Sequence, residues 1–119
     1  MDKFQAIHYF WSRFGILAYD ESSVPDNAQF PYLTYSVMVD SLDYPVTLTA
    51  DLYYKSTSWT EISQKTEQID GALINGEVIK LDTGYLWIVK GHPFAQRVAE
   101  EDDTIKHIYI VLSAEFLTQ

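Results

Sequence analysis

The sequence has 119 residues, no cysteine and a formal net charge of -9 at pH 7. This length is sufficient for one domain with a single core, and the lack of cysteine excludes disulfides, thiolate metal sites and a cysteine nucleophile. The negative charge repels nucleic-acid phosphates, which disfavours a protein that grips DNA but is compatible with a channel through which DNA slides. Aromatic residues make up 15% of the chain. Because one small core needs fewer, we expect some of them to face a partner.

No stretch of the sequence approaches the roughly twenty apolar residues of a membrane-spanning helix. At the amino terminus, Asp2, His8 and Arg13 interrupt every apolar run, so a secretory signal peptide is not predicted. We therefore expect a protein that stays in the cytosol where it is made and has no membrane partner.

The first predicted element is a short helix near the amino terminus. Asp2 begins a D-x-x-Q sequence typical of a capping box, and Gly15 ends the helical pattern. His8 borders the apolar stripe and has no His, Asp or Glu one turn away, which favours a partly buried helix histidine over a metal ligand. Residues 16–19 then form either a short strand or a cover for the helix end, and residues 20–31 form an extended loop with two prolines.

A strand followed by a helix lies at the centre of the sequence. Residues 46–55 alternate between two sets of side chains, which is the two-residue period of a half-buried strand. The alternation ends before Ser58, which has the spacing of a capping box with Glu61. Apolar residues of the following helix recur every three or four positions, so they share one face that can pack on the strand. Asn75-Gly76 is typical of the end of a helix.

The remaining strands are predicted from alternation and from turn residues. They are residues 32–39, 78–81, 85–90 and 105–117, with residues 94–98 as the continuation of the strand 85–90 beyond an interruption. The first of them is expected to pair with the central strand as an antiparallel hairpin through a polar loop. Gly84 is typical of a tight hairpin, and Gly91-His92-Pro93 indicates a bulge, because proline cannot donate to a strand ladder. The last strand is the longest, and we expect it to pair with the strand that begins at Tyr85.

The order of elements is helix, two strands, helix and three strands, which predicts an α+β domain over residues 1–119. We expect a mainly antiparallel sheet of four to five strands with two helices packed on one face. The opposite face is too polar for a second core layer but rich in aromatic and β-branched residues, so it is typical of a surface that meets another chain. Its predicted residues are Thr47, Thr49, Tyr53, Tyr109, Val111 and Ser113.

No pattern in the sequence nominates a reaction. The histidines do not have the spacing of zinc ligands; His92 and His107 are able to meet across the last hairpin, but two unrelated surface histidines are favoured. The acidic run at residues 100–103 lacks the ligand spacing of a calcium loop, which favours a solvated turn. We therefore expect no enzyme, no cofactor and no metal, although distant carboxylates that converge into a pair are left open.

Four segments of the sequence carry a resemblance to a known group. They are LTADLYYKSTSW at 48–59, VPD at 24–26 with PYLTYS at 31–36, GYLWI at 84–88 and GHPFAQR at 91–97. The chain resembles small proteins from the morphogenesis region of long-tailed bacteriophages and prophages, and among them the tail-terminator or tail-completion group. Members of that group are small α+β domains that assemble as a ring, commonly a hexamer, on the head-proximal end of the tail tube. The ring stops tube growth and offers a docking face to the head connector.

The resemblance implies a structural protein of the virion neck, assembled in the host cytoplasm. Its partners would be further copies of itself in a ring, the tail-tube protein and a head-completion or stopper protein, with DNA only passing through the lumen. On this reading, a contact between subunits is predicted for Tyr53, Tyr109 and Val111. A contact between neighbouring rings is predicted for His92, Phe94, Arg97, Glu100, Glu101, Asp102 and Asp103.

Three alternatives stay open at this point. The first keeps the phage neck but makes the protein a head-completion, stopper or minor capsid protein. The second is a small enzyme or ligand-binding domain that uses the region around His92 and His107. The third is a homodimeric module without a viral role, which would form a two-fold assembly instead of a ring.

Overall fold

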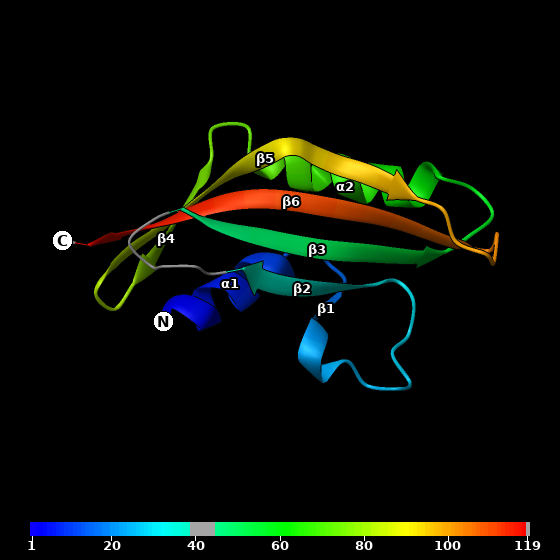
Figure 1. The fold of residues 1–119 in the computed structure, drawn as a ribbon, viewed down its shortest axis with the longest axis horizontal. Coiled ribbons are helices and arrows are strands. Elements are labelled where there is room, and N and C mark those ends of the chain that lie inside the picture. The colour runs from blue at the N-terminus through cyan, green and yellow to red at the C-terminus, as the bar shows by residue number, and fades with distance from the viewer. Residues whose placement is uncertain (39–44, 119) are drawn as a thin grey trace.

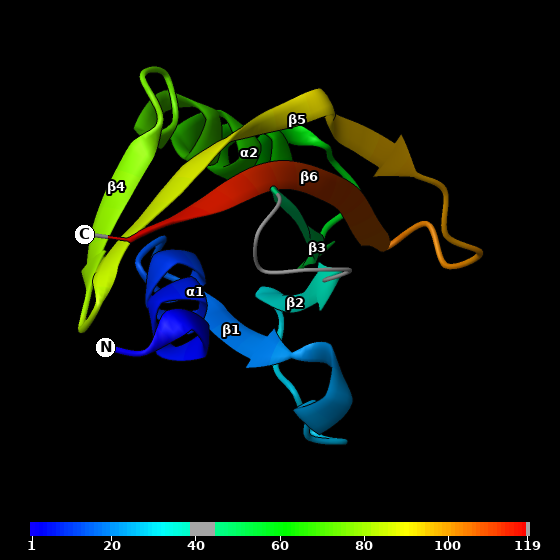
Figure 2. The ribbon, with the colours of Figure 1, turned by 60° about the vertical axis from the view of Figure 1, so that its left-hand side comes forward.

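A sheet that curls around two helices forms the fold (Figures 1 and 2). The computed structural model describes residues 1–38 and 45–118. The elements in chain order are α1 (Lys3–Ser12), β1 (Leu17–Asp20), the 3-10 turn η1 (Glu21–Ser23), β2 (Tyr32–Met38), β3 (Val46–Lys55), α2 (Thr60–Ala72), β4 (Glu77–Leu81), β5 (Gly84–Val98) and β6 (Ile105–Thr118). The predicted α+β class is confirmed.

The sheet has six strands in the described part of the chain, in the order β1-β2-β3-β6-β5-β4. Only β1 and β2 run parallel; the other neighbouring pairs are antiparallel. The prediction of four to five strands is therefore wrong by one, because the short segment after α1 adds to the sheet as a parallel edge strand. The expected pairing of β6 with β5 is confirmed. The loop predicted between β2 and β3 lies largely outside the described residues.

The core lies between the inner face of the sheet and the two helices. Figure 1 places both helices behind the sheet, and Figure 2 shows the sheet curling around α1, with β1 and β4 on either side of it. Alternate residues of β3 and β6, such as Leu48 and Ile110, are fully buried against helix residues such as Phe10 and Ile62. Each such side chain contributes roughly 1.5–3 kcal/mol by leaving water. The opposite face of the sheet, called the outer face below, carries neither helix.

The ends of the helices agree with the sequence in part. Asp2 and Gln5 form the predicted capping box of α1, with the Asp2 carboxylate accepting from the Gln5 amide at 2.8 Å. The predicted box at Ser58 does not form, because the Ser58 hydroxyl instead accepts from the amide of Thr60 at 3.1 Å, only two residues on. Beyond the end of α2, Gly76 has the left-handed conformation, with a φ of 76°.

The predicted interruption of β5 is a bulge. The register with β6 shifts between Lys90 and Ala95, so extra residues stand opposite a regular stretch of β6. Gly91 begins this bulge at a point where a Cβ atom would lie 2.6 Å from the carbonyl oxygen of Val111. The backbone of β5 therefore approaches β6 too closely at this position for any side chain.

Candidate functional site

The outer face is built from rows of side chains that the strand register places next to each other. Opposite residues in neighbouring strands point to the same face, so the register of β3 and β6 defines these rows. Thr47 stands opposite Ser113, Thr49 opposite Val111, and Tyr53 opposite His107. The six residues predicted to share this face therefore do share it.

A row of aromatic rings crosses one end of the outer face. Tyr32 of β2 stacks on Tyr53 of β3 with ring centroids 5.2 Å apart, and Tyr53 stacks on His107 of β6 at 4.5 Å. We call these three residues the aromatic row. Phe30 extends it in the loop before β2, at 5.3 Å from the Tyr32 ring. Such contacts fix flat rings side by side, which gives this end of the sheet a rigid surface.

His107 is the most constrained polar residue of the outer face. Its Nε2 atom lies 2.6 Å from the carboxylate of Asp51, and its Nδ1 atom lies 2.8 Å from the carboxylate of Glu100. The residue is only 8% exposed. A protonated imidazole donates from both nitrogens, whereas a neutral one donates from a single nitrogen, so this geometry fits the charged form.

The surroundings of His107 and Tyr53 change their pKa values. Burial lowers the pKa of His107, but the hydrogen bonds to Asp51 and Glu100 and the charges of these carboxylates outweigh it, and the net shift is upward from 6.5. Burial and then the charge of Asp51 raise the pKa of Tyr53 to about 12. In the aromatic row, a neutral Tyr53 therefore stacks on His107, which retains its proton more firmly than an ordinary histidine does.

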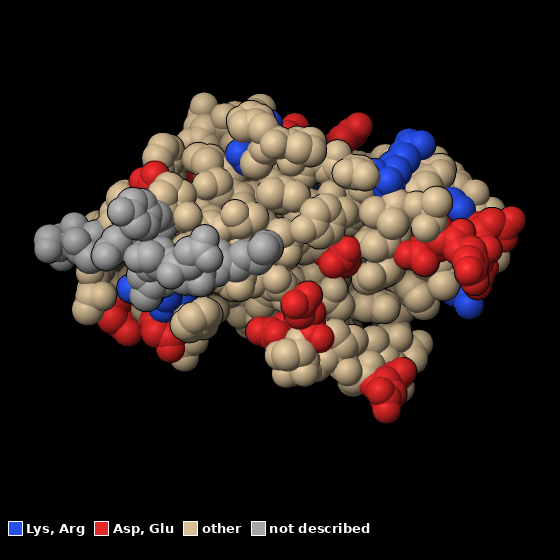
Figure 3. Space-filling view, viewed as in Figure 1, with Lys and Arg blue, Asp and Glu red and all other residues tan. Residues whose placement is uncertain are grey.

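The acidic run between β5 and β6 is a turn, as predicted, and Figure 3 shows its side chains gathered at one end of the molecule. Its members have different roles. Glu100 bonds to His107, and Asp102 accepts from the amide and hydroxyl of Thr104, hydrogen bonds that lower the pKa of Asp102. The side chains of Glu101 and Asp103 are exposed. This turn, residues 99–104, is called the tip below.

The residues predicted for a contact between rings occupy separate places. His92 and Phe94 belong to the bulge of β5, Arg97 lies near the end of β5, and the acidic residues lie at the tip. Arg97 also points to the inner side of the sheet, where its guanidinium carbon lies 4.5 Å from the centre of the Trp59 ring. The structure does not bring these residues into one surface. His92 and His107 are not neighbours either, since Val98 stands opposite His107.

An exposed apolar group that the sequence reading did not single out lies at the other end of the outer face. Val78 of β4 is 59% exposed, Trp87 of β5 is 38% exposed and Leu117 of β6 is 43% exposed. The register puts them on the same face of three neighbouring strands. We call them the apolar corner. The sequence does contain a sign of this group, because alternate residues of β5 are apolar on both faces of the strand, and one of those faces is the outer face.

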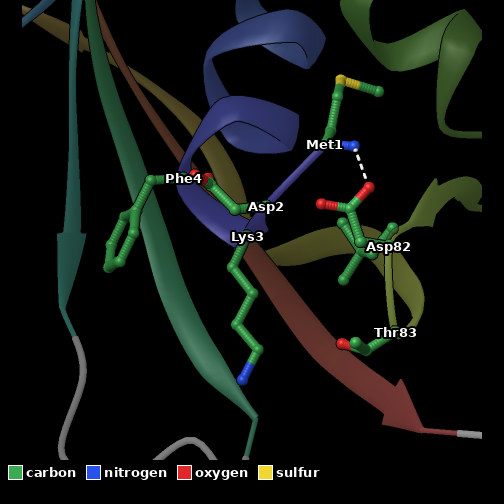
Figure 4. A pocket seen from close by; sticks show the side chains of 7 residues that line it. Met1, Asp2, Lys3, Phe4, Asp82 and Thr83 are labelled. Carbon is green, nitrogen blue, oxygen red and sulfur yellow. Dashed lines mark hydrogen bonds and ion pairs between the residues drawn. The ribbon is translucent and has the colours of Figure 1, made fainter.

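A pocket of about 400 Å³ lies between the start of α1 and the turn from β4 to β5. Figure 4 shows the amino group of Met1 directed at the carboxylate of Asp82, and the two lie 2.8 Å apart. Lys3 at the same pocket reaches over the ring of Phe116, at 4.9 Å. The carboxylate of Asp2, also at this pocket, accepts from the amide of Gln5 and so caps α1.

The described residues contain no group of three or more His, Asp or Glu side chains placed to hold a metal ion. None of their helices is long and apolar enough to cross a membrane. No protein-family model and no curated protein sequence matches the chain. The function proposed below therefore rests on the sequence segments quoted above and on the geometry of this molecule.

Proposed function

We propose that the protein is a structural subunit of a phage tail, which assembles with copies of itself into a ring at the head-proximal end, ends tail-tube growth and joins tail to head. The observation that carries the proposal is the outer face of the sheet. Neither α1 nor α2 covers it, and it carries the aromatic row at one end and the apolar corner at the other. The three residues of the apolar corner are exposed on neighbouring strands, and contiguous exposed apolar groups mark surfaces that bind other chains.

The arrangement of the two surfaces favours a ring over a two-fold dimer. A two-fold contact uses the same patch on both subunits, whereas a head-to-tail contact needs two different patches. The aromatic row lies on β2, β3 and β6, and the apolar corner lies on β4, β5 and β6, toward the other edge of the sheet. Two unlike patches on one subunit are what a head-to-tail ring requires.

The subunit contact predicted at Tyr53, Tyr109 and Val111 belongs to the same proposal. All three side chains lie on the outer face and are partly exposed, so they are accessible to a neighbour. With a formal charge of -9 on each copy, a hexamer would carry a strongly negative surface, which suits a lumen through which DNA passes without sticking. The tail-tube protein and a stopper protein would dock on the two rims of the ring.

The first test is the native mass of the purified protein over a series of protein and salt concentrations. We expect a discrete species of about six subunits. A stable dimer at every concentration would contradict the ring. If only a monomer is found, tail tubes are added, and failure of the protein to bind their ends would also count against the proposal.

Two matched variants connect the assembly to the outer face. Val78→Asp places a charge in the apolar corner and is expected to abolish the ring while the monomer stays folded. Phe4→Asp makes the same change at a residue that is 63% exposed but lies on α1, away from the outer face. It should assemble like the unchanged protein. If Val78→Asp assembles normally, the apolar corner is not the contact.

Binding experiments distinguish the proposed tail terminator from the first alternative, a head-completion or stopper protein. A terminator binds purified tail tube, whereas a head-completion or stopper protein binds the portal, so the two partners are offered side by side. The enzyme alternative gains no support from His107, since both of its ring nitrogens are engaged and the residue is 8% exposed.

A further inference from the structure

The two halves of the tip are attached to the molecule in different ways. The second half is held through the backbone, because the amide of Ser56 donates to the carbonyl oxygen of Thr104 at 2.7 Å, and the amide of Ile105 donates to the carbonyl oxygen of Asp102 at 3.1 Å. The side chain of Asp102 closes the same turn. These contacts do not involve a histidine.

The first half of the tip, residues 99–101, depends on one side chain. The carboxylate of Glu100 lies 2.8 Å from Nδ1 of His107. In the described part of the chain, the side chains of Ala99 and Glu101 make no hydrogen bond or ion pair. The bond between Glu100 and His107 is thus the side-chain attachment of this segment to the sheet.

The state of His107 decides how many carboxylates it can hold. When charged it donates to both Asp51 and Glu100; when neutral it has one donor and one acceptor nitrogen, and a carboxylate that faces the acceptor loses its bond. Asp51 lies in the middle of the sheet, within β3, and is the closer partner at 2.6 Å. Glu100 lies in a turn, and its side chain is 34% exposed. Loss of the proton therefore releases Glu100.

We propose that His107 is a proton-dependent latch that holds the first half of the tip on the outer face when charged and frees it when neutral. The latch is a property of the single chain and does not depend on the function proposed above. It would change the shape and charge of one end of the outer face without unfolding the sheet.

The groups that face His107 support this assignment. Asp51 and Tyr53 come from β3, Glu100 comes from the tip, and Tyr32 of β2 stacks on the far side of Tyr53. Both tyrosines have a raised pKa, mainly through burial, so they stay neutral where a histidine titrates. β5 places the uncharged Val98 opposite His107.

Two lysines near the tip act elsewhere. Lys55 and Lys106 both act on Asp102, and Lys106 also donates to the backbone of Asp103. The charges that favour the proton of His107, against the effect of burial, are therefore those of Asp51 and Glu100.

The test is a pH titration followed by nuclear magnetic resonance, which reports the His107 imidazole and the backbone amides of residues 99–101 together. We expect these amides to shift with the same midpoint as the imidazole and to become more mobile above it. Glu100→Gln removes one of the two charges that favour the proton, so the proton affinity of His107 should fall about tenfold, which is about one pH unit.

The matched control is Glu101→Gln, which removes the same charge from the neighbouring residue but no contact with His107. It should leave both the midpoint and the response of the amides unchanged. Central amides of β3 and β6 report whether each variant keeps the sheet. The proposal is overturned if residues 99–101 ignore the titration of His107, or if Glu101→Gln has the effect of Glu100→Gln.

Discussion

The Nε2 atom of His107 lies 2.6 Å from Oδ1 of Asp51, although 56 residues separate the two along the chain. This contact ties β3 to β6 through side chains in addition to the backbone ladder. It also places a charge-assisted hydrogen bond on a histidine that is only 8% exposed, where such a bond is stronger than between two fully exposed groups.

The first prediction is that the free energy of unfolding falls as the pH rises through the raised pKa of His107. The folded protein binds this proton more firmly than the unfolded chain, whose histidine has the ordinary pKa of 6.5. The contribution is therefore complete below about pH 6.5 and is lost above the folded-state value. Urea unfolding from about pH 5.5 to about pH 9 measures the slope. His107→Gln should flatten the dependence of the free energy of unfolding on pH. The control is His92→Gln at an exposed histidine, which should leave this dependence unchanged. Equal slopes in the two variants would contradict the prediction.

The second prediction concerns the ionisation of Tyr53. Burial, followed by the charge of Asp51, raises its pKa to about 12. Burial also raises the pKa values of Tyr32, Tyr35 and Tyr54. Tyr53 should therefore contribute to a late step when the absorbance of tyrosinate is followed through alkaline pH, and Tyr53→Phe should reduce the amplitude of that step by one tyrosine. The unfolded protein in denaturant is the control, since its tyrosines titrate together near about pH 10. Stability should decline from about pH 10 upward, because only the unfolded chain then gives up this proton.

The third prediction compares two glycines. Gly91→Ala places a Cβ atom 2.6 Å from the carbonyl oxygen of Val111, which is backbone and cannot move aside, so we expect a loss of roughly 1–3 kcal/mol. Gly71 lies in α2 with no atom within 4 Å of such a Cβ. Gly71→Ala should therefore stabilise the protein by roughly 0.5–1 kcal/mol. Urea unfolding of both variants checks the pair, and a harmless Gly91→Ala would mean that the bulge is looser than described.

The fourth prediction concerns the start of α1. Asp2→Ala removes the side chain that accepts from the Gln5 amide and is expected to cost about 1 kcal/mol, while Asp2→Asn keeps an acceptor and should cost less. Asp26→Ala is the control, an exposed carboxylate in a loop, and should change stability by less than about 0.5 kcal/mol. Thermal unfolding of the three variants is sufficient to rank them, and equal losses from Asp2→Ala and Asp26→Ala would argue against the cap.

Long alternating segments were predictable because their signal is repeated many times. Residues 46–55 were predicted as a strand with the bounds of β3, and 105–117 falls one residue short of the end of β6. The cap at Asp2 was predictable because it is local. The hydrogen bond made by Ser58 was not predictable. A serine hydroxyl can accept from the amide two residues on or from the amide three residues on, and the sequence does not distinguish the two bonds.

What the sequence could not supply is the pairing between distant segments. β1 has four residues, too few to show a period, and it becomes a strand only because β2 lies beside it. The expectation that His107 is a surface histidine is wrong, because the residue is only 8% exposed. Its partners Asp51 and Glu100 depend on the register of β3 with β6 and on the path of the tip, and neither has a local signal. The sequence alone therefore does not pair His107 with either carboxylate.

The position of β6 has a consequence for the order of events during synthesis. β6 lies between β3 and β5 and pairs with both, although it follows the other five strands of the described sheet in the chain. Until residues 105–118 have left the ribosome, β3 and β5 each present an open backbone edge, and the inner face has no continuous sheet on which α2 can settle. Formation of the sheet, and with it the outer face, waits for the final strand. Until that strand arrives, the open edges of β3 and β5 are available for pairing with other chains, so the interval before β6 is made is the one in which the chain is most prone to misassembly.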